Sequence, residues 1–80
     1  MEYLATFFTH SGAIKYQKLL RNQGCSVDLM PVPRKVSSNC GVAAKFNYEN
    51  KIQTIISDDI ECLYIVEEKA YKLLYKAGEE

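Results

Sequence analysis

The chain has 80 residues, of which 48% are hydrophobic and 11% aromatic, and its ten basic residues balance ten acidic ones. This composition argues against intrinsic disorder, and the neutral charge argues against nucleic acid as a partner, because phosphate backbones attract basic surfaces. We therefore expect a single domain over residues 1–80. No apolar run reaches the roughly 20 residues needed to cross a bilayer, so no membrane partner is expected. The acidic start at Glu2 is also unlike a signal peptide.

Three cysteines, Cys25, Cys40 and Cys62, form an odd set with irregular spacing. Secreted domains held together by disulfides normally have an even number, so the reducing cytoplasm is the expected location. The sequence has no C-x-x-C pair and no cluster of histidine and cysteine. It therefore indicates neither a structural zinc site nor any other metal or cofactor.

The first half of the chain predicts a strand, a helix and a second strand. Residues 3–9 are rich in aromatic and other strand-favouring residues and predict the first strand. Ser11 is a candidate N-cap for a helix over residues 13–22, and Gly24 is the expected stop. Residues 25–32 alternate apolar and polar side chains, and two prolines end this strand because proline cannot donate to a β-ladder.

The second half predicts two more strands, over residues 42–46 and 62–66. Between them a helix is predicted from about Asn47 to Ser57, on the i, i+3, i+4 spacing of Ile52, Ile55 and Ile56. The tail also has helical spacing and is compatible with a short amphipathic closing helix that buries Ala70, Leu73 and Leu74.

The resulting order, β-α-β-β-α-β, is typical of the ferredoxin-like fold of the α+β class. This fold is a four-stranded antiparallel sheet in the order 4-1-3-2, with two helices on one face. Strands one and two then end at the same edge of the sheet, where strand four begins. We expect His10, Ser11, the loop of residues 31–41, and Asp58 and Asp59 to meet at that edge.

The loop PVPRKVSSNCG, residues 31–41, places Cys40 in polar surroundings. The thiolate is the nucleophilic form of cysteine, and nearby cations and N–H groups favour it, so Cys40 is a candidate reactive residue. His10 is a candidate base or hydrogen-bond donor for the sulfur. The candidate anion-stabilising groups are Arg34, Ser37, Ser38 and Gly41. The alternative is that Cys40 is simply a small residue before a strand.

The other two cysteines are expected to pack in the core. Cys25 opens a strand beside Gly24, and Cys62 lies within a strand. Cys62 is also a candidate resolving thiol for Cys40, provided that loop motion closes a gap of roughly 10 Å between them.

The motif PVPR, two residues, SS, one residue, CG resembles a family of small bacterial domains, the selenium/sulfur carrier protein-like family. The resemblance covers the chain to about Val66, includes Thr6, Phe7 and His10, and is strongest over residues 31–46. It implies that Cys40 holds sulfur or selenium as a persulfide or selenopersulfide. It also implies that the partner is a cysteine desulfurase or another protein of a sulfur or selenium relay.

Two functions stay open. In the first, the protein is a cytoplasmic carrier that passes sulfur or selenium through Cys40, and whether such transfer makes it an enzyme is left open. In the second, it is a regulatory or interaction module whose loop binds an anion or small molecule without covalent chemistry. A homodimer formed through the edge of strand two is a third role, but it leaves the composition of the loop without a purpose.

Overall fold

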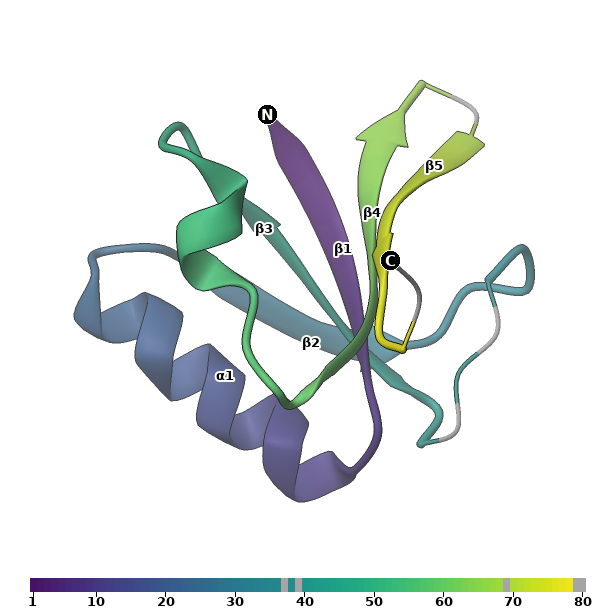
Figure 1. Cartoon of the computed structure of the whole chain (residues 1–80), viewed down its shortest axis with the longest axis horizontal. Coiled ribbons are helices and arrows are strands. Elements are labelled where there is room, and N and C mark those ends of the chain that lie inside the picture. Colours follow the sequence, from purple (N-terminus) through teal and green to yellow (C-terminus); the bar gives the residue numbers. More distant parts are fainter. Residues whose placement is uncertain (37, 39, 69, 79–80) are drawn as a thin grey trace.

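The computed structural model shows a five-stranded antiparallel sheet with one α-helix packed across one face (Figure 1). It describes residues 1–36, 38, 40–68 and 70–78. The sheet order is β2-β3-β1-β4-β5, so β2 and β5 are its edges. In chain order the elements are β1 (Glu2–Phe7), α1 (His10–Asn22), β2 (Val27–Pro31), β3 (Val42–Asn47), the single 3-10 turn η1 (Ile52–Ile55), β4 (Ile60–Glu67) and β5 (Ala70–Lys76).

The predicted ferredoxin-like fold is wrong, and its second helix is the first reason. Where a helix over residues 47–57 was expected, the chain forms only η1, with the hydroxyl of Thr54 donating to the carbonyl of Lys51 at 2.7 Å. Helical spacing of the isoleucines is present, but β-branched side chains lose rotamer freedom in a helix. Of the five residues 52–56, four are β-branched: Ile52, Thr54, Ile55 and Ile56.

The C-terminal tail is the second reason, because it forms strand β5 and not a closing helix. β5 pairs antiparallel with β4 from Glu67 opposite Ala70 onward, so the two strands form a hairpin. Along β5, Tyr71 lies opposite Val66 and Leu73 opposite Tyr64, which gives both side chains apolar cross-strand neighbours. The first four strands lie in the order β2-β3-β1-β4, and β5 pairs with β4 and extends the sheet beyond it.

α1 covers one face of the sheet and buries the main core against it. The Tyr16 ring packs against Phe7 and Phe46, with ring centroids 5.4 Å and 5.9 Å apart. Aromatic pairs at these separations stabilise a core beyond the effect of their buried area. The other fully buried residues of this cluster include Ala5, Ala13, Leu20, Ala44, Ile60 and Leu63.

Both ends of α1 are closed by local hydrogen bonds. The N-cap is Thr9, whose Oγ1 accepts the N–H of Gly12 at 2.9 Å, so the prediction of Ser11 as the cap is wrong. The predicted stop at Gly24 is confirmed: its φ is +85°, a conformation that glycine adopts without strain. In the described residues, no helix is long and apolar enough to cross a membrane.

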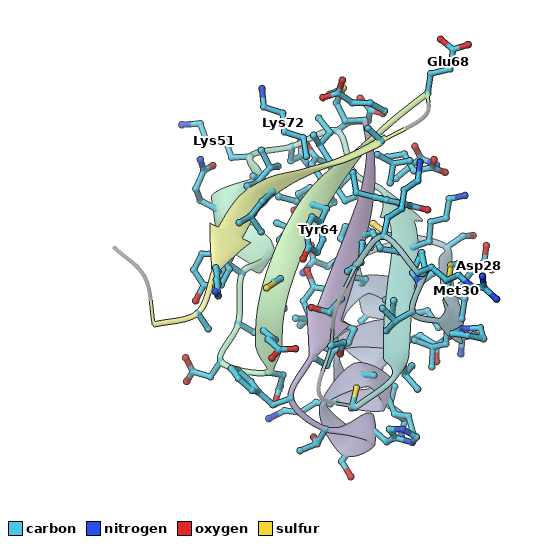
Figure 2. The ribbon with its side chains drawn as sticks, turned by 90° about the vertical axis from the view of Figure 1, so that its right-hand side faces the viewer. Asp28, Met30, Lys51, Tyr64, Glu68 and Lys72 are labelled. Carbon is cyan, nitrogen blue, oxygen red and sulfur yellow. The ribbon has the colours of Figure 1, made fainter. Side chains whose placement is uncertain are left out.

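The loop between β2 and β3 covers the opposite face of the sheet, as Figures 1 and 2 show from two directions. Val36, only 8% exposed, forms a second buried cluster with Leu4 and Ala43. Met30 and Tyr64 pack against this cluster and are labelled on the same side in Figure 2. Val36, together with Val32, thus attaches the loop to the sheet face that lies opposite α1.

Tyr16 predicts how stability depends on pH. Its hydroxyl donates to the carbonyl of Ile55 at 2.7 Å, and burial, followed by the nearby Tyr48 and Cys25, raises the pKa of Tyr16 well above its usual value. A raised pKa gives stability that is fully present below the unfolded pKa of about 10 and is lost as pH rises towards the folded pKa.

We expect the free energy of unfolding of Tyr16→Phe at neutral pH to be about 1–2 kcal/mol lower than that of the wild type, because the carbonyl of Ile55 loses its donor. Above about pH 10 the free energy of unfolding should fall less steeply for Tyr16→Phe than for the wild type. Urea titrations at neutral and alkaline pH measure both effects. Parallel pH curves for the two proteins would contradict this account.

Candidate functional site

Three segments meet where β1 ends, at one of the two sheet edges that are formed by strand ends: the turn into α1, the end of the β2–β3 loop, and the approach to β4. Nε2 of His10 lies 2.7 Å from the carbonyl oxygen of Cys40, 30 residues further along the chain. The hydroxyl of Ser38 donates to the carbonyl of Phe7 at 3.4 Å. The prediction that His10 and Cys40 share one edge is therefore confirmed.

The Cys40 thiol is half-buried and has two polar neighbours. Its Sγ–H donates to the carbonyl of Val42 at 3.5 Å, and Sγ lies 3.9 Å from the hydroxyl oxygen of Ser38. The same oxygen accepts the backbone N–H of Cys40 at 3.4 Å. A hydroxyl has one proton, so Ser38 can donate to the sulfur only when it rotates away from the Phe7 carbonyl.

His10 contacts the backbone of Cys40 and not its thiol. A carbonyl oxygen only accepts, so the 2.7 Å contact requires a proton on Nε2 of His10. That nitrogen is therefore a donor and cannot act as the base for the thiol in this arrangement. His10 instead fixes the position of the Cys40 peptide relative to the first turn of α1.

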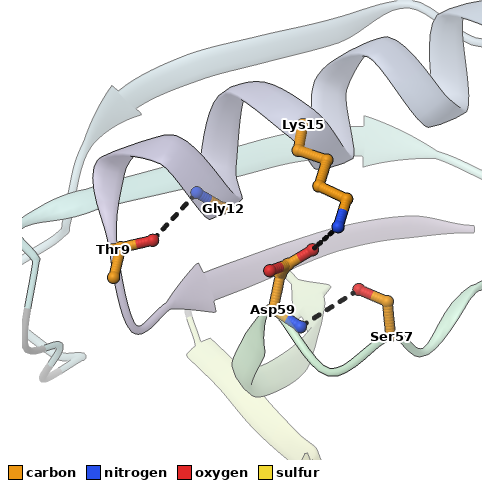
Figure 3. A network of polar contacts seen from close by, with 5 residues as sticks. All are labelled: Thr9, Gly12, Lys15, Ser57 and Asp59. Atoms are coloured by element: carbon orange, nitrogen blue, oxygen red, sulfur yellow. Dashed lines mark hydrogen bonds and ion pairs between the residues drawn. The ribbon is translucent and has the colours of Figure 1, made fainter.

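The N-terminus of α1 faces a carboxylate that the sequence analysis did not assign to it (Figure 3). A Cβ placed on Gly12 would lie 3.2 Å from the Cβ of Asp59, so a larger residue at position 12 would crowd Asp59. Asp59 also forms an ion pair with Lys15 at 3.7 Å. A negative side chain at this end stabilises the helix dipole. The N-terminus of α1, which was expected to stabilise the Cys40 sulfur, therefore lies beside Asp59 and is capped by Thr9.

Arg34 and Lys35 lie away from the thiol. Both line an open hollow of about 720 Å³ together with Glu2 and Glu67. Glu2 begins β1 and Glu67 ends β4, so the hollow lies at the other end of these strands from Phe7. The five residue-to-residue steps of β1 from Glu2 to Phe7 correspond to about 16 Å. The structure therefore does not bring the guanidinium of Arg34 to Cys40.

Of the other predicted loop residues, Gly41 is exposed and has a φ of +74°, which allows the sharp turn into β3. Its carbonyl accepts the N–H of Val32 at 3.1 Å and so closes the base of the loop. Ser37 lies outside the described residues.

Comparison with protein-family models finds one described as "Putative Se/S carrier protein-like", which matches residues 2–72. The match runs from β1 into β5 and includes the whole β2–β3 loop. The chain belongs to this Se/S carrier-like family. Searches of curated proteins and of solved structures find no match.

All three cysteines of this Se/S carrier-like chain are free thiols, but they differ in their surroundings. Cys25 is half-buried and packs against the main core. Cys62 is buried in β4, and its carbonyl accepts the hydroxyl of Thr6 at 3.5 Å. Burial, and then a hydrogen bond with Cys62, raise the pKa of Tyr64 to about 12. Cys25 and Cys40 both lie in connections, Cys25 before β2 and Cys40 before β3, so Cys25 does not open the strand as predicted.

The described residues contain no group of three or more histidine, cysteine, aspartate or glutamate side chains placed to hold a metal ion. Within the same residues, no hydrogen bond or disulfide joins Cys62 to Cys40. A resolving role for Cys62 therefore remains a prediction.

Proposed function

We propose that the protein accepts sulfur or selenium on Cys40 and passes it to an acceptor. The observation that supports this most is the position of Cys40 at the end of the loop, beside Ser38 and His10, in a chain of the Se/S carrier-like family. Cys62 is buried in β4, and Cys25, which is half-buried like Cys40, lies between α1 and β2, away from Ser38 and His10. The three free thiols favour a reducing compartment such as the cytoplasm.

The transfer step balances without an added oxidant or reductant. The Cys40 thiol first loses its proton to solvent, which ends its hydrogen bond to the carbonyl of Val42. The thiolate then attacks the terminal sulfur of a donor persulfide, R–S–SH. The donor S–S bond breaks, its electron pair leaves on the donor as R–S⁻, and a new S–S bond forms on Cys40. The proton stays on the transferred sulfur, so the product is Cys40–S–SH.

The side chains around Cys40 have defined roles in this step. The hydroxyl of Ser38 turns from the Phe7 carbonyl to donate to the sulfur anion, which lies within its reach at 3.9 Å. His10 holds the Cys40 carbonyl and so limits the motion of the peptide that bears the thiol. Arg34 lines a separate hollow and takes no part.

Intact mass spectrometry tests this function on protein purified without reductant and incubated with a cysteine desulfurase and cysteine. We expect the wild type to gain the mass of one sulfur atom, and Cys40→Ser to gain none. Cys25→Ser is the matched control because Cys25 is also a half-buried free thiol, and it should load as the wild type does. Equal labelling of Cys40→Ser, or a wild type that never loads, would refute the proposal.

The hollow at Arg34 favours a second function, an anion-binding module without covalent chemistry. Arg34 lies in this hollow with the half-buried ring of Tyr71, whereas Lys45, which also lines it, is paired with Glu2 at 3.8 Å. A guanidinium binds carboxylates and phosphates through two parallel hydrogen bonds. In this case Arg34→Ala would abolish binding of an anion, and Cys40→Ser would leave it unchanged.

A further inference from the structure

The solvent-facing side of α1 has an unusual set of residues next to the Cys40 site. His10, Ile14, Lys18 and Arg21 lie at intervals of four, four and three residues, which places them along one stripe of the helix. Ile14 is 48% exposed although it is a large apolar residue. An exposed isoleucine between a histidine and two cations is not needed to stabilise α1, since the core face is formed by other residues.

An apolar groove runs beside this stripe, between α1 and the edge strand β2. It has a volume of about 350 Å³ and is lined by His10, Ala13 and Ile14 from α1, residues 29–31 of β2, and Val42. Apart from His10, the side chains that line it are apolar. Binding sites for partner side chains are typically grooves of this kind, with a small number of polar groups at the rim.

Two contacts connect the groove directly to the thiol. His10, at the rim, is hydrogen-bonded to the Cys40 carbonyl at 2.7 Å. Val42, which lines the groove, accepts the hydrogen bond of the Cys40 Sγ–H at 3.5 Å. A side chain that fills the groove therefore contacts two residues that are hydrogen-bonded to Cys40.

The charge on α1 indicates what kind of surface would bind there. α1 contains three of the ten basic residues of the chain and none of the ten acidic ones. Lys15 forms an ion pair with Asp59 at 3.7 Å, and Lys18 lines the same hollow as Asp58 and Asp59, on the side of the helix away from the groove. Lys18 and Arg21 form no ion pair in the described part of the chain.

We infer that this stripe and groove form the docking surface for an acidic segment of a partner protein. The segment has an aliphatic side chain that fills the groove and acidic residues that pair with Lys18 and Arg21. It is the segment that flanks the donor's persulfide, because the filled groove adjoins Cys40. This inference rests on the proposed carrier function and adds the chemistry of the donor.

Two synthetic peptide persulfides test the inference, and glutathione persulfide serves as a small donor without a docking segment. In one peptide a leucine and four glutamates flank the persulfidated cysteine; in the other, a serine and four lysines do. We expect the acidic peptide to load Cys40 at least about tenfold faster than the basic one at low salt, with the difference shrinking as salt rises. Stopped samples analysed by intact mass give the rates.

Surface variants then locate the effect on the protein. Lys18→Glu with Arg21→Glu, and separately Ile14→Ser, should each lower the rate with the acidic peptide about tenfold and leave the rate with glutathione persulfide unchanged. The controls are Lys51→Glu with Lys72→Glu, two exposed lysines that Figure 2 labels away from α1, and Leu73→Ser, at an exposed leucine of β5. Circular dichroism verifies that each variant is folded.

The outcomes separate the two proposals. No loading of the wild type by any donor would refute the carrier function itself. Loading at equal rates by both peptides, or rates unaffected by the α1 variants, would refute the docking surface and leave the carrier function standing. Binding of the protein to anionic phospholipid vesicles through Ile14 and Lys18, with equal peptide rates, would also refute it by making this face a membrane contact.

Discussion

Replacing Phe7 by alanine should lower the free energy of unfolding by about 3–5 kcal/mol, because it removes a large buried ring and leaves a cavity. Phe7 is fully buried, and its ring packs against Tyr16 beneath α1. A domain of this size is stable by only about 4–12 kcal/mol, so the substitution should remove at least about a quarter of the free energy of unfolding. Urea unfolding followed by circular dichroism measures the change.

Phe8→Ala is the matched control, since it makes the same substitution one residue later in the chain. Phe8 is 45% exposed and lies just past the end of β1. Its replacement should cost less than about 1 kcal/mol, as surface substitutions usually do. If the two variants were equally destabilised, the assignment of Phe7 to the core face under α1 would be wrong.

The strands near the centre of the sheet were predictable because their sequences alternate in a way that the sheet requires. In β3, Val42, Ala44 and Phe46 face the α1 side, and Lys45 lies on the other. In β5 the alternation is interrupted, because the register with β4 shifts between Leu63 and Tyr64, and Tyr71 and Tyr75 pack against opposite faces of the sheet. The tail also has helical spacing, and only the hairpin with β4 decides between strand and helix.

The candidate site was predictable in part for a similar reason. Because β1 and β2 both end at one edge, topology alone brings His10 near Cys40. Arg34 was expected near the thiol because it is only six residues from Cys40 in the sequence. It lies instead in the hollow with Glu2 and Glu67, and Val36, between the two residues in the chain, packs on the sheet. Asp59 was expected at the same edge, yet its role at the start of α1 depends on the space above Gly12, which no spacing rule reveals.

The attachment of the loop by Val36 leads to a prediction about the reactivity of Cys40. Val36 is 8% exposed and contacts the cluster of Leu4 and Ala43, whereas the residues before and after it in the described loop are more exposed. Burying a valine side chain stabilises a structure by about 1.5–3 kcal/mol. This contact therefore limits how often the loop, and with it the half-buried thiol of Cys40, leaves the sheet.

Val36→Asp should detach the loop, because a carboxylate without a partner is strongly disfavoured in an apolar cluster. A loss of 1.5–3 kcal/mol raises the open population by roughly ten- to a hundredfold, and alkylation of Cys40 by iodoacetamide should accelerate by at least about tenfold. Peptide mapping assigns the reaction to Cys40 and follows Cys25 as an internal reference. Val36→Ala should give a smaller increase in the same direction.

Arg34→Ala is the control in the same loop, because Arg34 is exposed and lines the distant hollow. Its alkylation rate should equal that of the wild type if Arg34 lies as far from the thiol as the structure places it. A slower rate in Arg34→Ala would instead support the sequence-based interpretation that the guanidinium stabilises the thiolate. An unchanged rate in Val36→Asp would show that Val36 does not control access to Cys40. A more local motion beside the thiol would then have to expose it.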